Sequence, residues 1–570
     1  MRLKVDVLDH DLPQCKVLVS TRGCDYTMQA GDLVAWPAEL IEVSNLGNPD
    51  EMDYASYLLH SEGIRYQQHL PVATVKKIGH SPTLFTRLTN LRRQLQLKIF
   101  NTSISPSSQH FIVALLLGDQ SVIDKDTRQD FSAAGVAHIL ALSGLHIGVI
   151  TLIIWWLLFP LDYMRLKKCR LLITLAAIAL FAVFTGLSPS VVRSTIMIGL
   201  VFAAQFYHRR SVSFNALAVA ALLILIFKPS AIYSVGFQLS FITVAAIVLF
   251  ARVPQSLESK HQWVNHFTST IITSLVAMLA TIALSAHYFH TISLMSVLSN
   301  LLILPVLPVF MSLGALFLLV TIAGMHWPVL NCALDTINDY IHWIARTVKM
   351  IPGSHWEGIY VSTFGIIIYF AIITLVAMWL YRRRYSYLIA AGVALAVLLG
   401  HSLWVDVHTP RQGLVVLSSF TSTPVLSYSN GQGLVWTPDG EDTDSSAFVR
   451  FYAGFIARHG INHLKFIDNN DTIRTSQALI KPPLAYLMGH RILAVGNSNW
   501  KNVSSPSHRL ALDEIIITSR YRGDVEPLLE RYRFDRMVIS VAHQESRRLR
   551  HEGERLRLQV DVGYCELSPR

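Results

Sequence analysis

The feature that most constrains this chain is an apolar region that runs from about residue 138 to residue 405. Segments of roughly 20 apolar residues follow one another there, and a helix of that length crosses the hydrocarbon core of a bilayer. Backbone groups inside lipid must be paired within the protein, so the sequence predicts a polytopic α-helical membrane protein. The predicted segments are 139–160, 171–187, 191–207, 214–227, 233–251, 268–286, 293–323, 329–350, 359–381 and 386–405.

Two of these segments differ from simple membrane spans. The segment 293–323 is too long for one crossing and contains Pro305 and Pro308, so we predict a broken helix or a tight hairpin there. The segment 329–350 is interrupted by polar side chains, so we predict that it is interfacial or faces a cavity. These side chains are Asp335, Asn338, Asp339, His342 and Arg346.

The composition indicates a membrane protein with soluble parts, and the basic loops indicate its orientation. Hydrophobic residues make up 52% of the chain and charged residues 15%, which is too apolar for a protein that is soluble throughout. The net charge of +10 suits nucleic acid or anionic lipid, but Lys and Arg also gather in cytoplasmic loops of membrane proteins. We assign loops 165–170, 208–210, 252–260 and 382–384 to the cytoplasm, which places both ends of the chain outside.

The stretch Phe131–Ile150 is apolar enough to enter a membrane yet carries two histidines and three glycines. Polar groups at such depth face a protein-lined or wet interior, and small residues let another backbone approach closely. We therefore predict that this stretch lines a passage, together with polar residues of later segments. The candidate path residues are His138, Ser143, Gly144, His146, Arg193, Gln238, Ser240 and Asn300.

Most of these candidates also have a purely structural interpretation. His138 and His146 would lie about 80° apart around a helix axis, so we expect no metal site from this pair, and each ring could be a buried, hydrogen-bonded imidazole. Gln238 could bond a neighbouring helix backbone, and Gly144 could serve close packing. Arg193 could meet a phosphate or extend to the interface.

The chain before the apolar region alternates apolar and polar residues up to about residue 75, which predicts β-strands. A helix is predicted within 48–64, ending at Gly63. A second helix is predicted at 84–100, lying either along the membrane surface or against the β-region. Asp119 follows a glycine, a position that favours a helix cap or turn over a chemical role.

The chain after residue 405 has ordinary polarity and predicts alternating strands and helices, which indicates a mixed α/β part. Between Arg520 and Arg557, arginines are mixed with aromatic residues, a composition that suits binding of a nucleic-acid strand by charge and stacking. Interleaved acidic residues favour a solvated, mixed-charge helix equally well. The candidate contacts in this region are Arg520, Tyr521 and Arg522.

Five motifs, in this order, resemble the ComEC family of competence proteins, whose members form the inner-membrane channel for transforming DNA. They are LLLGD (115–119), FSAAGVAHILALSGLHIG (131–148), GLSPSVVRS (186–194), SVGFQLSF (234–241) and SNLLILPVLP (299–308). The resemblance implies an oligonucleotide-binding-type (OB-like) β domain at 1–75, interfacial helices at 76–135, a membrane core at 136–405 and a metallo-β-lactamase-like domain at 406–570. Family members commonly have membrane helices before the OB-like domain, so we expect that this domain is truncated or incomplete here.

The C-terminal domain departs from the hydrolytic members of the family it resembles. These need an HxHxDH cluster, because two metal ions must share a hydroxide and each ion needs several N or O ligands. This chain has NHLKFIDNNDT at 462–472, TSRYRGD at 518–524 and SVAHQESRR at 540–548. We therefore predict a pseudo-enzyme without metal or other cofactor. A metal site from Asp468, Asp471 and His543 is the less favoured alternative.

The resemblance implies a multi-pass protein of the bacterial inner membrane that passes single-stranded transforming DNA into the cytoplasm, with both soluble domains outside. It also implies contact with membrane lipids and two protein partners, a DNA receptor and a cytoplasmic DNA-translocating ATPase, and it leaves homo-oligomerisation open. The sequence has no GxxxxGK[ST] motif, so the driving force is expected from a partner. The alternatives are a membrane-tethered metal-dependent nuclease and a transporter of another anionic substrate.

Overall fold

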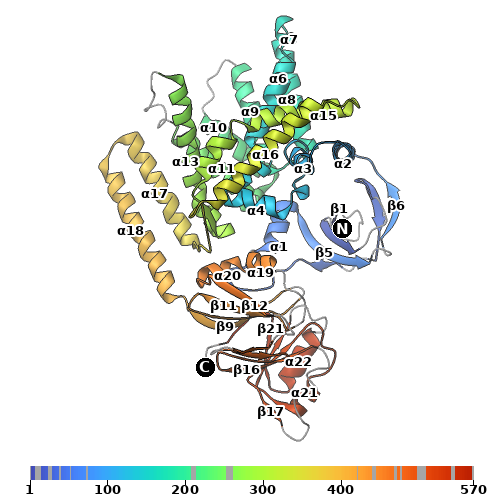
Figure 1. The fold of residues 1–570 in the computed structure, drawn as a ribbon, viewed down its shortest axis with the longest axis vertical. Helices are drawn as coiled ribbons and strands as arrows, with labels where there is room; N and C mark the ends of the chain where they lie inside the picture. The colour runs from blue at the N-terminus through green and yellow to red at the C-terminus, as the bar shows by residue number, and fades with distance from the viewer. Residues whose placement is uncertain are drawn as a thin grey trace.

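The computed structural model describes most of the 570 residues of the chain. The described ranges are 2–6, 15–22, 28–37, 40–51, 53–71, 75–206, 213–251, 261–419, 422–438, 445–467, 472–474, 478–496, 509–540 and 546–567. Helices gather at one end of the molecule, the N-terminal strands lie beside and below them, and the C-terminal sheets form the opposite end (Figure 1).

The N-terminal strands form a four-stranded sheet and a separate pair. The strands are β1 (Arg2–Asp6), β2 (Lys16–Arg22), β3 (Asp32–Ala35), β4 (Ile41–Glu42), β5 (Ile64–Pro71) and β6 (Lys76–His80). The sheet has the order β1-β2-β5-β4, and β3 pairs with β6. β-structure is therefore present where the alternating pattern predicts it, and β6 extends it beyond residue 75.

Two helices accompany these strands. The helix predicted within 48–64 is shorter in the structure: α1 (Tyr54–Tyr57) continues as the π-helical turn η1 (Leu58–Glu62) and ends at Gly63, whose φ of 73° suits glycine. α2 (Leu84–Phe100) begins at a capping box made by Thr83 and Thr86. The Asn90 side chain bonds both the N–H and the C=O of Ala30, so α2 packs against the β-region. α2 also contacts helices of the apolar region, so it joins the two parts.

The apolar region consists of helices whose limits lie close to the predicted segments. In chain order they are α3 (Pro106–Ile112), η3 (Val113–Leu117), η4 (Gln120–Val122), α4 (Lys125–Ala133), α5 (Ala137–Leu140), α6 (Gly144–Leu157), α7 (Pro160–Tyr163), α8 (Lys167–Phe184), α9 (Pro189–Phe206), α10 (Ser213–Phe227), η5 (Pro229–Tyr233), α11 (Val235–Leu249), α13 (Gln262–Phe289), α14 (Ser296–Ile303), α15 (Leu307–Ile322), α16 (Pro328–Met350), α17 (Thr363–Arg382) and α18 (Tyr385–His408). A short strand pair, β7 (Thr291–Ser293) with β8 (His355–Glu357), lies among them.

Within the described ranges, three helices are long and apolar enough to cross a membrane: Phe267–Phe289, Thr363–Arg382 and Tyr385–His408. A fourth crossing results if α14 and α15 count as one span, since they are bent by 47° at a short break. Pro305 lies in that break and Pro308 in the first turn of α15, so the long predicted segment is a broken helix. Several shorter apolar helices pack beside these.

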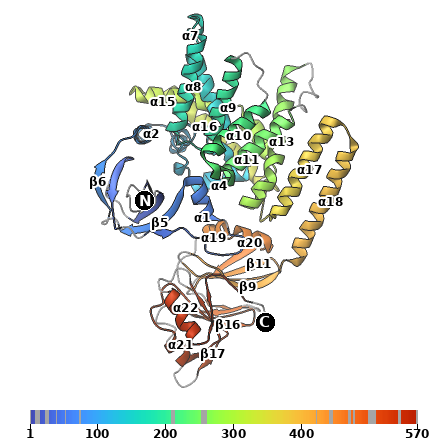
Figure 2. The same cartoon turned by 180° about the vertical axis from the view of Figure 1, so that it is seen from behind.

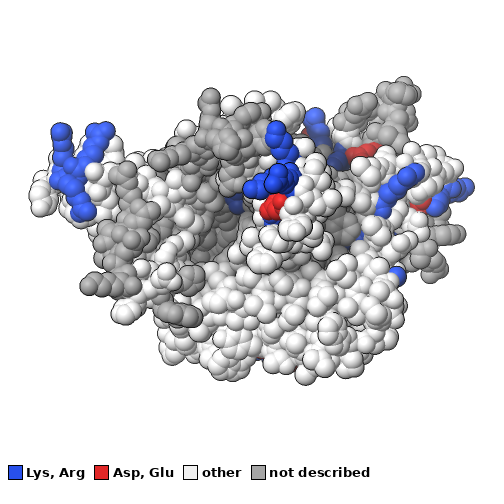
Figure 3. Space-filling view, turned by 90° about the horizontal axis from the view of Figure 1, so that it is seen from above, with Lys and Arg blue, Asp and Glu red and all other residues white. Residues whose placement is uncertain are grey.

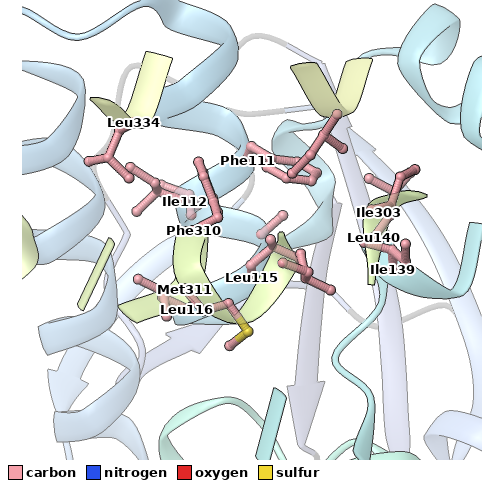
Figure 4. Packing of buried hydrophobic residues seen from close by; sticks show 14 of the residues in the cluster. Phe111, Ile112, Leu115, Leu116, Ile139, Leu140, Ile303, Phe310, Met311 and Leu334 are labelled. Carbon is pink, nitrogen blue, oxygen red and sulfur yellow. The ribbon is translucent and has the colours of Figure 1, made fainter. Parts of the chain in front are cut away.

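The helices enclose an apolar core. Figure 4 shows side chains of α3 and η3 meeting those of α5, α14, α15 and α16. The fully buried ring of Phe111 lies 5.2 Å from that of Phe310 and 5.4 Å from that of His342 (centroid distances). On α16, Asn338 and His342 lie on the face that packs in this core and are buried, whereas Asp339 and Arg346 are exposed. The predicted polar interruption thus belongs to an amphipathic helix with one face in the core.

In the described residues, the C-terminal part has two large sheets, a two-stranded pair of β17 with β19, and four helices. The strands are β9 (Gln412–Val416), β10 (Val425–Ser429), β11 (Gln432–Trp436), β12 (His463–Ile467), β13 (Ile473–Arg474), β14 (Ala478–Lys481), β15 (Leu484–Leu487), β16 (His490–Val495), β17 (Leu510–Ala511), β18 (Glu514–Ile517), β19 (Tyr532–Arg533), β20 (Arg536–Ile539), β21 (Gln559–Val562) and β22 (Cys565–Leu567). The helices are α19 (Ser445–Phe451), α20 (Ala453–Arg458), α21 (Glu526–Arg531) and α22 (Ser546–Arg555).

These elements form four layers. One sheet has the order β12-β11-β10-β9-β22 and the other β13-β14-β15-β16-β18-β20-β21. An apolar cluster that includes Trp436 and Ile516 joins the two sheets. A second cluster joins the first sheet to α19 and α20, and a third joins the other sheet to α21 and α22. The last strand, β22, returns to the first sheet beside β9.

The N-terminal and C-terminal parts touch each other below the helices, at the end of the molecule away from α7 (Figures 1 and 2). The Asn48 side chain accepts from Ser418 N–H at 2.8 Å and donates to Ser418 C=O at 2.9 Å. The Asp50 carboxylate lies 3.1 Å from the Arg458 guanidinium. Two segments that are 370 residues apart in sequence are thereby joined by buried hydrogen bonds.

The opposite face carries basic side chains at separated points and is otherwise largely uncharged (Figure 3). Arg165, Lys167 and Lys168 near α7, and Arg382–Arg384 at the turn between α17 and α18, are exposed. The loops 208–210 and 252–260, which we also predicted to be cytoplasmic, lie outside the described residues.

Candidate functional site

The segment that joins α4 to α6 packs directly against the start of α14. Ser293 Oγ donates to Ala133 C=O at 2.9 Å, and Ser299 Oγ donates to Ala134 C=O at 2.8 Å. Gly135 follows with a φ of +74°, and a Cβ placed on it would lie 2.6 Å from Ser296 Cβ. Glycine is therefore needed at residue 135 both for its backbone conformation and for close packing.

The first turn of α6 holds His146 in a fixed orientation. Ser143 is the N-cap residue, and its hydroxyl lies 2.7 Å from Nδ1 of His146 while its N–H lies 3.2 Å from the same atom. The imidazole is fully buried, and its Nε2 atom has no hydrogen-bond partner among the described residues. A buried imidazole is thus bonded on one nitrogen and free on the other.

Arg193 lies on the first turns of α9 and faces the start of α6. Its side chain is 5% exposed, and its Nε and Nη1 atoms are unpaired within the described part of the chain. Nη2 reaches Ser190 Oγ at 3.4 Å, and the guanidinium carbon lies 5.7 Å from the centre of the Phe241 ring. A Cβ placed on Gly144 would lie 3.9 Å from Nη2, so the two helices approach each other closely here.

His138, in contrast to His146, has an exposed side chain. It is nevertheless densely surrounded by protein and lies close enough to His146 to interact with it electrostatically.

Asn300 lies on the buried face of α14, the helix that packs against Ala133–Gly135. Its side chain is 8% exposed, and its Oδ1 atom lacks a hydrogen-bond partner among the residues described. Ser296, one turn earlier, likewise has a buried hydroxyl without such a partner.

Gln238 has a structural role. Its Nε2 donates to Ile232 C=O at 2.9 Å, and its Oε1 accepts from the Tyr288 hydroxyl at 2.9 Å. Both ends of the amide are therefore used in joining α11 to η5 and α13. Ser240, on the same helix, is half-buried.

The structure thus brings part of the predicted path together. His138, Ser143, Gly144, His146 and Arg193 lie where α6 and α9 begin, and Asn300 lies on the helix that packs against the segment leading into α6. Sequence reasoning missed the hydroxyls that accompany them. These are Ser188, Ser190, Ser194, Thr195 and Ser296. The motif GLSPSVVRS could have indicated several of these hydroxyls, because it places three serines close to Arg193 in sequence.

Asp119 acts as a helix cap, as its position after Gly118 predicts. Its carboxylate accepts from Ser121 N–H at 3.0 Å and from Gln96 Nε2 at 2.6 Å. Burial alone would raise the pKa of Asp119, but the hydrogen bonds from Ser121 and Gln96 hold it below its ordinary value. The carboxylate that joins η4 to α2 is therefore ionised.

In the C-terminal part, the three predicted contacts differ in accessibility. Tyr521 is 4% exposed, its hydroxyl donates to Asp524 C=O at 2.7 Å, and burial raises its pKa to about 12. Its ring therefore presents no free face for stacking, whereas Arg520 and Arg522 are exposed. Asp468, Asp471 and His543 lie outside the described residues. Elsewhere in the described chain, no group of three or more His, Cys, Asp or Glu side chains is placed to hold a metal ion.

Comparison with known proteins relates this helical region to a family. Residues 115–384 match the family model described as Competence protein, and this range contains all the path residues discussed above. This helical region is similar to the ComEC family of competence proteins.

Two relatives support this similarity to the ComEC family. "ComE operon protein 3" of Bacillus subtilis (strain 168) is 27% identical over 215 residues, which cover 37% of this chain and 26% of the relative. "Competence protein ComA" of Neisseria gonorrhoeae is 29% identical over 155 residues, which cover 26% of this chain and 22% of the relative. The matches thus span about a quarter of the length of each relative. No solved structure matches the chain.

Proposed function

We propose that this protein forms the passage by which a single strand of DNA crosses the bacterial inner membrane during natural competence. In this proposal the helices from 136 to 405 form the passage, and both soluble parts lie outside the cytoplasm. A DNA receptor on the outside and a DNA-translocating ATPase in the cytoplasm are the proposed partners. The match to the family model and the printed names of the relatives support the role in DNA uptake.

The observation that carries the proposal is a set of buried, unpaired polar atoms at the starts of α6 and α9 and on α14, which packs against the segment leading into α6. An unpaired buried polar group costs free energy, so such groups deserve a functional explanation when they occur together. Nε2 of His146, Oδ1 of Asn300 and two guanidinium nitrogens of Arg193 are of this kind among the described residues. A strand with phosphates and base edges offers acceptors and donors to all three.

Charge on the two faces supports the proposed orientation. The exposed Arg and Lys side chains near α7 and at the α17–α18 turn lie at the end of the helices that faces away from both soluble parts (Figures 1 and 3). Basic loops favour the cytoplasmic side of a membrane. The soluble parts are therefore proposed to receive DNA before it enters the passage.

The domain assignments are part of the same proposal. A four-stranded sheet with an additional strand pair supports an OB-like domain at 1–75, and the helix–sheet–sheet–helix layers support a metallo-β-lactamase-like domain at 406–570. We propose that the latter is a pseudo-enzyme, because the HxHxDH motif is absent from its sequence. Metal analysis of the purified full chain tests this: stoichiometric zinc or manganese would favour the nuclease alternative.

The experiment that tests DNA passage measures transformation frequency and the recovery of labelled DNA inside the inner membrane. Strains without the gene, with the intact chain, and with His146→Ala or Asn300→Ala at equal expression are compared. We expect the deletion to abolish internal label while DNA remains at the cell surface. Both variants are expected to reduce internal label, because each removes a polar atom, Nε2 of His146 or Oδ1 of Asn300, that has no hydrogen-bond partner among the described residues.

Thr151→Val is the matched control for His146→Ala. Thr151 is also buried on α6, but its hydroxyl already donates to Ile147 C=O at 2.6 Å and is not available to a strand. This variant is expected to keep full uptake. Undiminished uptake in the deletion strain would refute DNA passage as the function and would favour transport of another anionic substrate.

A further inference from the structure

The environment of Arg193 differs from that of the other arginine buried among these helices, Arg170. Arg170 is 4% exposed, and its guanidinium pairs with Asp162, donates to Trp155 C=O and lies 3.8 Å from the centre of the Trp155 ring. Arg193 is equally buried and lies near the Phe241 ring, but in the described part of the chain its one hydrogen bond is the 3.4 Å contact with Ser190 Oγ, and no carboxylate pairs with it. A buried cation normally has an anionic partner.

The first turn of α6 supplies additional donors beside this cation. The Ser143 side chain accepts from the N–H of the third residue of the helix, and Ile147 N–H bonds Ser143 C=O at 3.3 Å. Helix geometry leaves the N–H groups of Gly144 and Leu145 without partners inside the helix. α6 has 14 residues, so its aligned peptide dipoles favour an anion at this end.

Gly144 permits the close approach that this arrangement needs. A Cβ at this position would lie 2.9 Å from Ser194 Oγ and 3.9 Å from Arg193 Nη2. Glycine at this position therefore lets the α6 backbone lie against the Ser194 hydroxyl and close to the guanidinium. Gly144 and Ser190 are half-buried and Leu145 is exposed, so this contact lies near the accessible surface of the helices.

We propose that Arg193 and the first turn of α6 form a binding site for a phosphodiester group. The guanidinium would supply two neighbouring N–H groups, either Nε–H with Nη2–H or Nη1–H with Nη2–H, the α6 backbone would supply the N–H groups of Gly144 and Leu145, and the Ser190 hydroxyl would complete the shell. Arginine presents its donors in a fixed fork that matches phosphate oxygens, and these bonds are charge-assisted. The proposal rests on the proposed DNA passage, since it assigns the phosphodiester to the passing strand.

The position of the site agrees with a phosphate that enters from the side of the soluble parts. α6 and α9 both begin at the end of the helices away from α7, and His138, with its exposed side chain, lies close to His146 at the same end. The shared chemistry, a phosphodiester monoanion, also occurs in phospholipid headgroups. The experiment therefore distinguishes a nucleic-acid strand from a lipid.

The test measures binding of a labelled oligo(dT) to the purified full chain in a maltoside detergent, which carries no phosphate, over a series of salt concentrations. Arg193→Gln is expected to weaken binding about tenfold and to lower the slope of log affinity against log salt by about 0.7, the contribution of one phosphate contact on a single strand. Lys167→Gln removes one positive charge near the α7 end, where Lys167 is exposed, and is expected to leave affinity and slope unchanged.

A second arm uses an oligonucleotide of the same sequence with an uncharged methylphosphonate backbone. Intact protein should bind it weakly, and Arg193→Gln should make no further difference, because the group that Arg193 contacts is no longer charged. A third arm adds phosphatidylglycerol to the oligonucleotide assay and measures thermal stabilisation of the lipid-free chain by the same lipid.

The arms separate the two proposals. The phosphodiester site is refuted, while DNA passage stands, if Arg193→Gln changes neither the affinity for oligo(dT) nor the salt slope. This outcome requires that the variant has an unchanged melting temperature. If Arg193→Gln does not fold, Arg193→Lys serves instead, since it keeps the charge, loses the fork and is predicted to bind more weakly. Stabilisation by phosphatidylglycerol that depends on Arg193, without oligo(dT) binding, supports the site and refutes the DNA strand as its ligand.

Discussion

The contact between Asn48 and Ser418 predicts a measurable coupling between the two soluble parts. Asn48→Ala removes the acceptor of the Ser418 N–H and one of two donors to the Ser418 C=O, which also accepts from the Tyr452 hydroxyl at 2.7 Å. A buried N–H left without a partner costs about 1–3 kcal/mol, and the lost bond to the carbonyl about 1 kcal/mol more. We therefore expect Asn48→Ala to weaken docking of the two parts by about 2–4 kcal/mol.

Hydrogen–deuterium exchange of the purified chain measures this loss. At about 1.4 kcal/mol for each factor of ten, a loss of 2 kcal/mol corresponds to about 30-fold faster exchange of amides that open when the parts separate. Peptides covering 44–53 and 452–460 report on the two sides of the contact. Exchange should accelerate in both peptides of Asn48→Ala.

A second variant perturbs the same contact by a different physical effect. A Cβ on Gly454 would lie 2.2 Å from Asp50 C=O, so Gly454→Ala forces the two segments apart and should accelerate exchange of the same peptides. Asn45→Ala is the control, because Asn45 bonds only Asp53 and Ala55 within its own part. It should affect 44–53 but leave 452–460 unchanged. Unchanged protection of both peptides in Asn48→Ala and Gly454→Ala would refute the docking argument.

Three further predictions concern single positions. Gly135→Ala should lower the melting temperature of the purified chain, because residue 135 has a φ of +74° and the added Cβ would lie 2.6 Å from a neighbouring side chain. Gly148→Ala is the control, because its added Cβ would lie near no atom within 4 Å, so the melting temperature should not change. Equal changes in the two variants would contradict the packing described. His490→Ala removes one partner of Glu514, 2.9 Å away in the core, and should destabilise the C-terminal part by about 1–3 kcal/mol in denaturant titrations, more than Arg491→Ala at the neighbouring pair, where the arginine is exposed. Burial alone would raise the pKa of Asp32, but hydrogen bonds from Gln29 N–H, Lys77 and His80 lower it to about 2. The ionised carboxylate therefore stabilises the β3–β6 pair fully above about pH 4, and this stabilisation is lost towards pH 2. Exchange protection of 32–35 that stays constant between these pH values would contradict the prediction.

Helix positions were predictable because apolar length is a local property of the sequence. The segments 214–227 and 386–405 correspond closely to α10 and α18, and Gly63 ends its helix as predicted. The short strands β13–β15 were missed, since segments of two to four residues carry little periodicity. β22 was missed because its pairing with β9 joins residues far apart in the chain.

The residue types of the candidate site were predictable from the sequence, but the burial and hydrogen bonding of each side chain were not. Polar residues inside apolar segments identified His146, Arg193 and Asn300, but whether each is paired depends on helices that lie far away in sequence. Gln238 is also a polar residue inside an apolar segment, but both ends of its side-chain amide are hydrogen-bonded. Tyr521 is buried, so it does not present the ring face that the predicted stacking on bases requires. Burial and pairing are tertiary properties, which no local pattern reports.

The covalent route from Asn48 to Ser418 passes through the helices from α1 to α18, yet the two residues touch. A contact between two segments of one chain forms at an effective concentration set by the connection, which reaches the millimolar range when the connection allows the encounter. Bonds too weak to hold two separate proteins together can therefore stay formed here, and they can also open without loss of the partner. Separating the C-terminal part from the helices would remove this concentration and, with it, the contact.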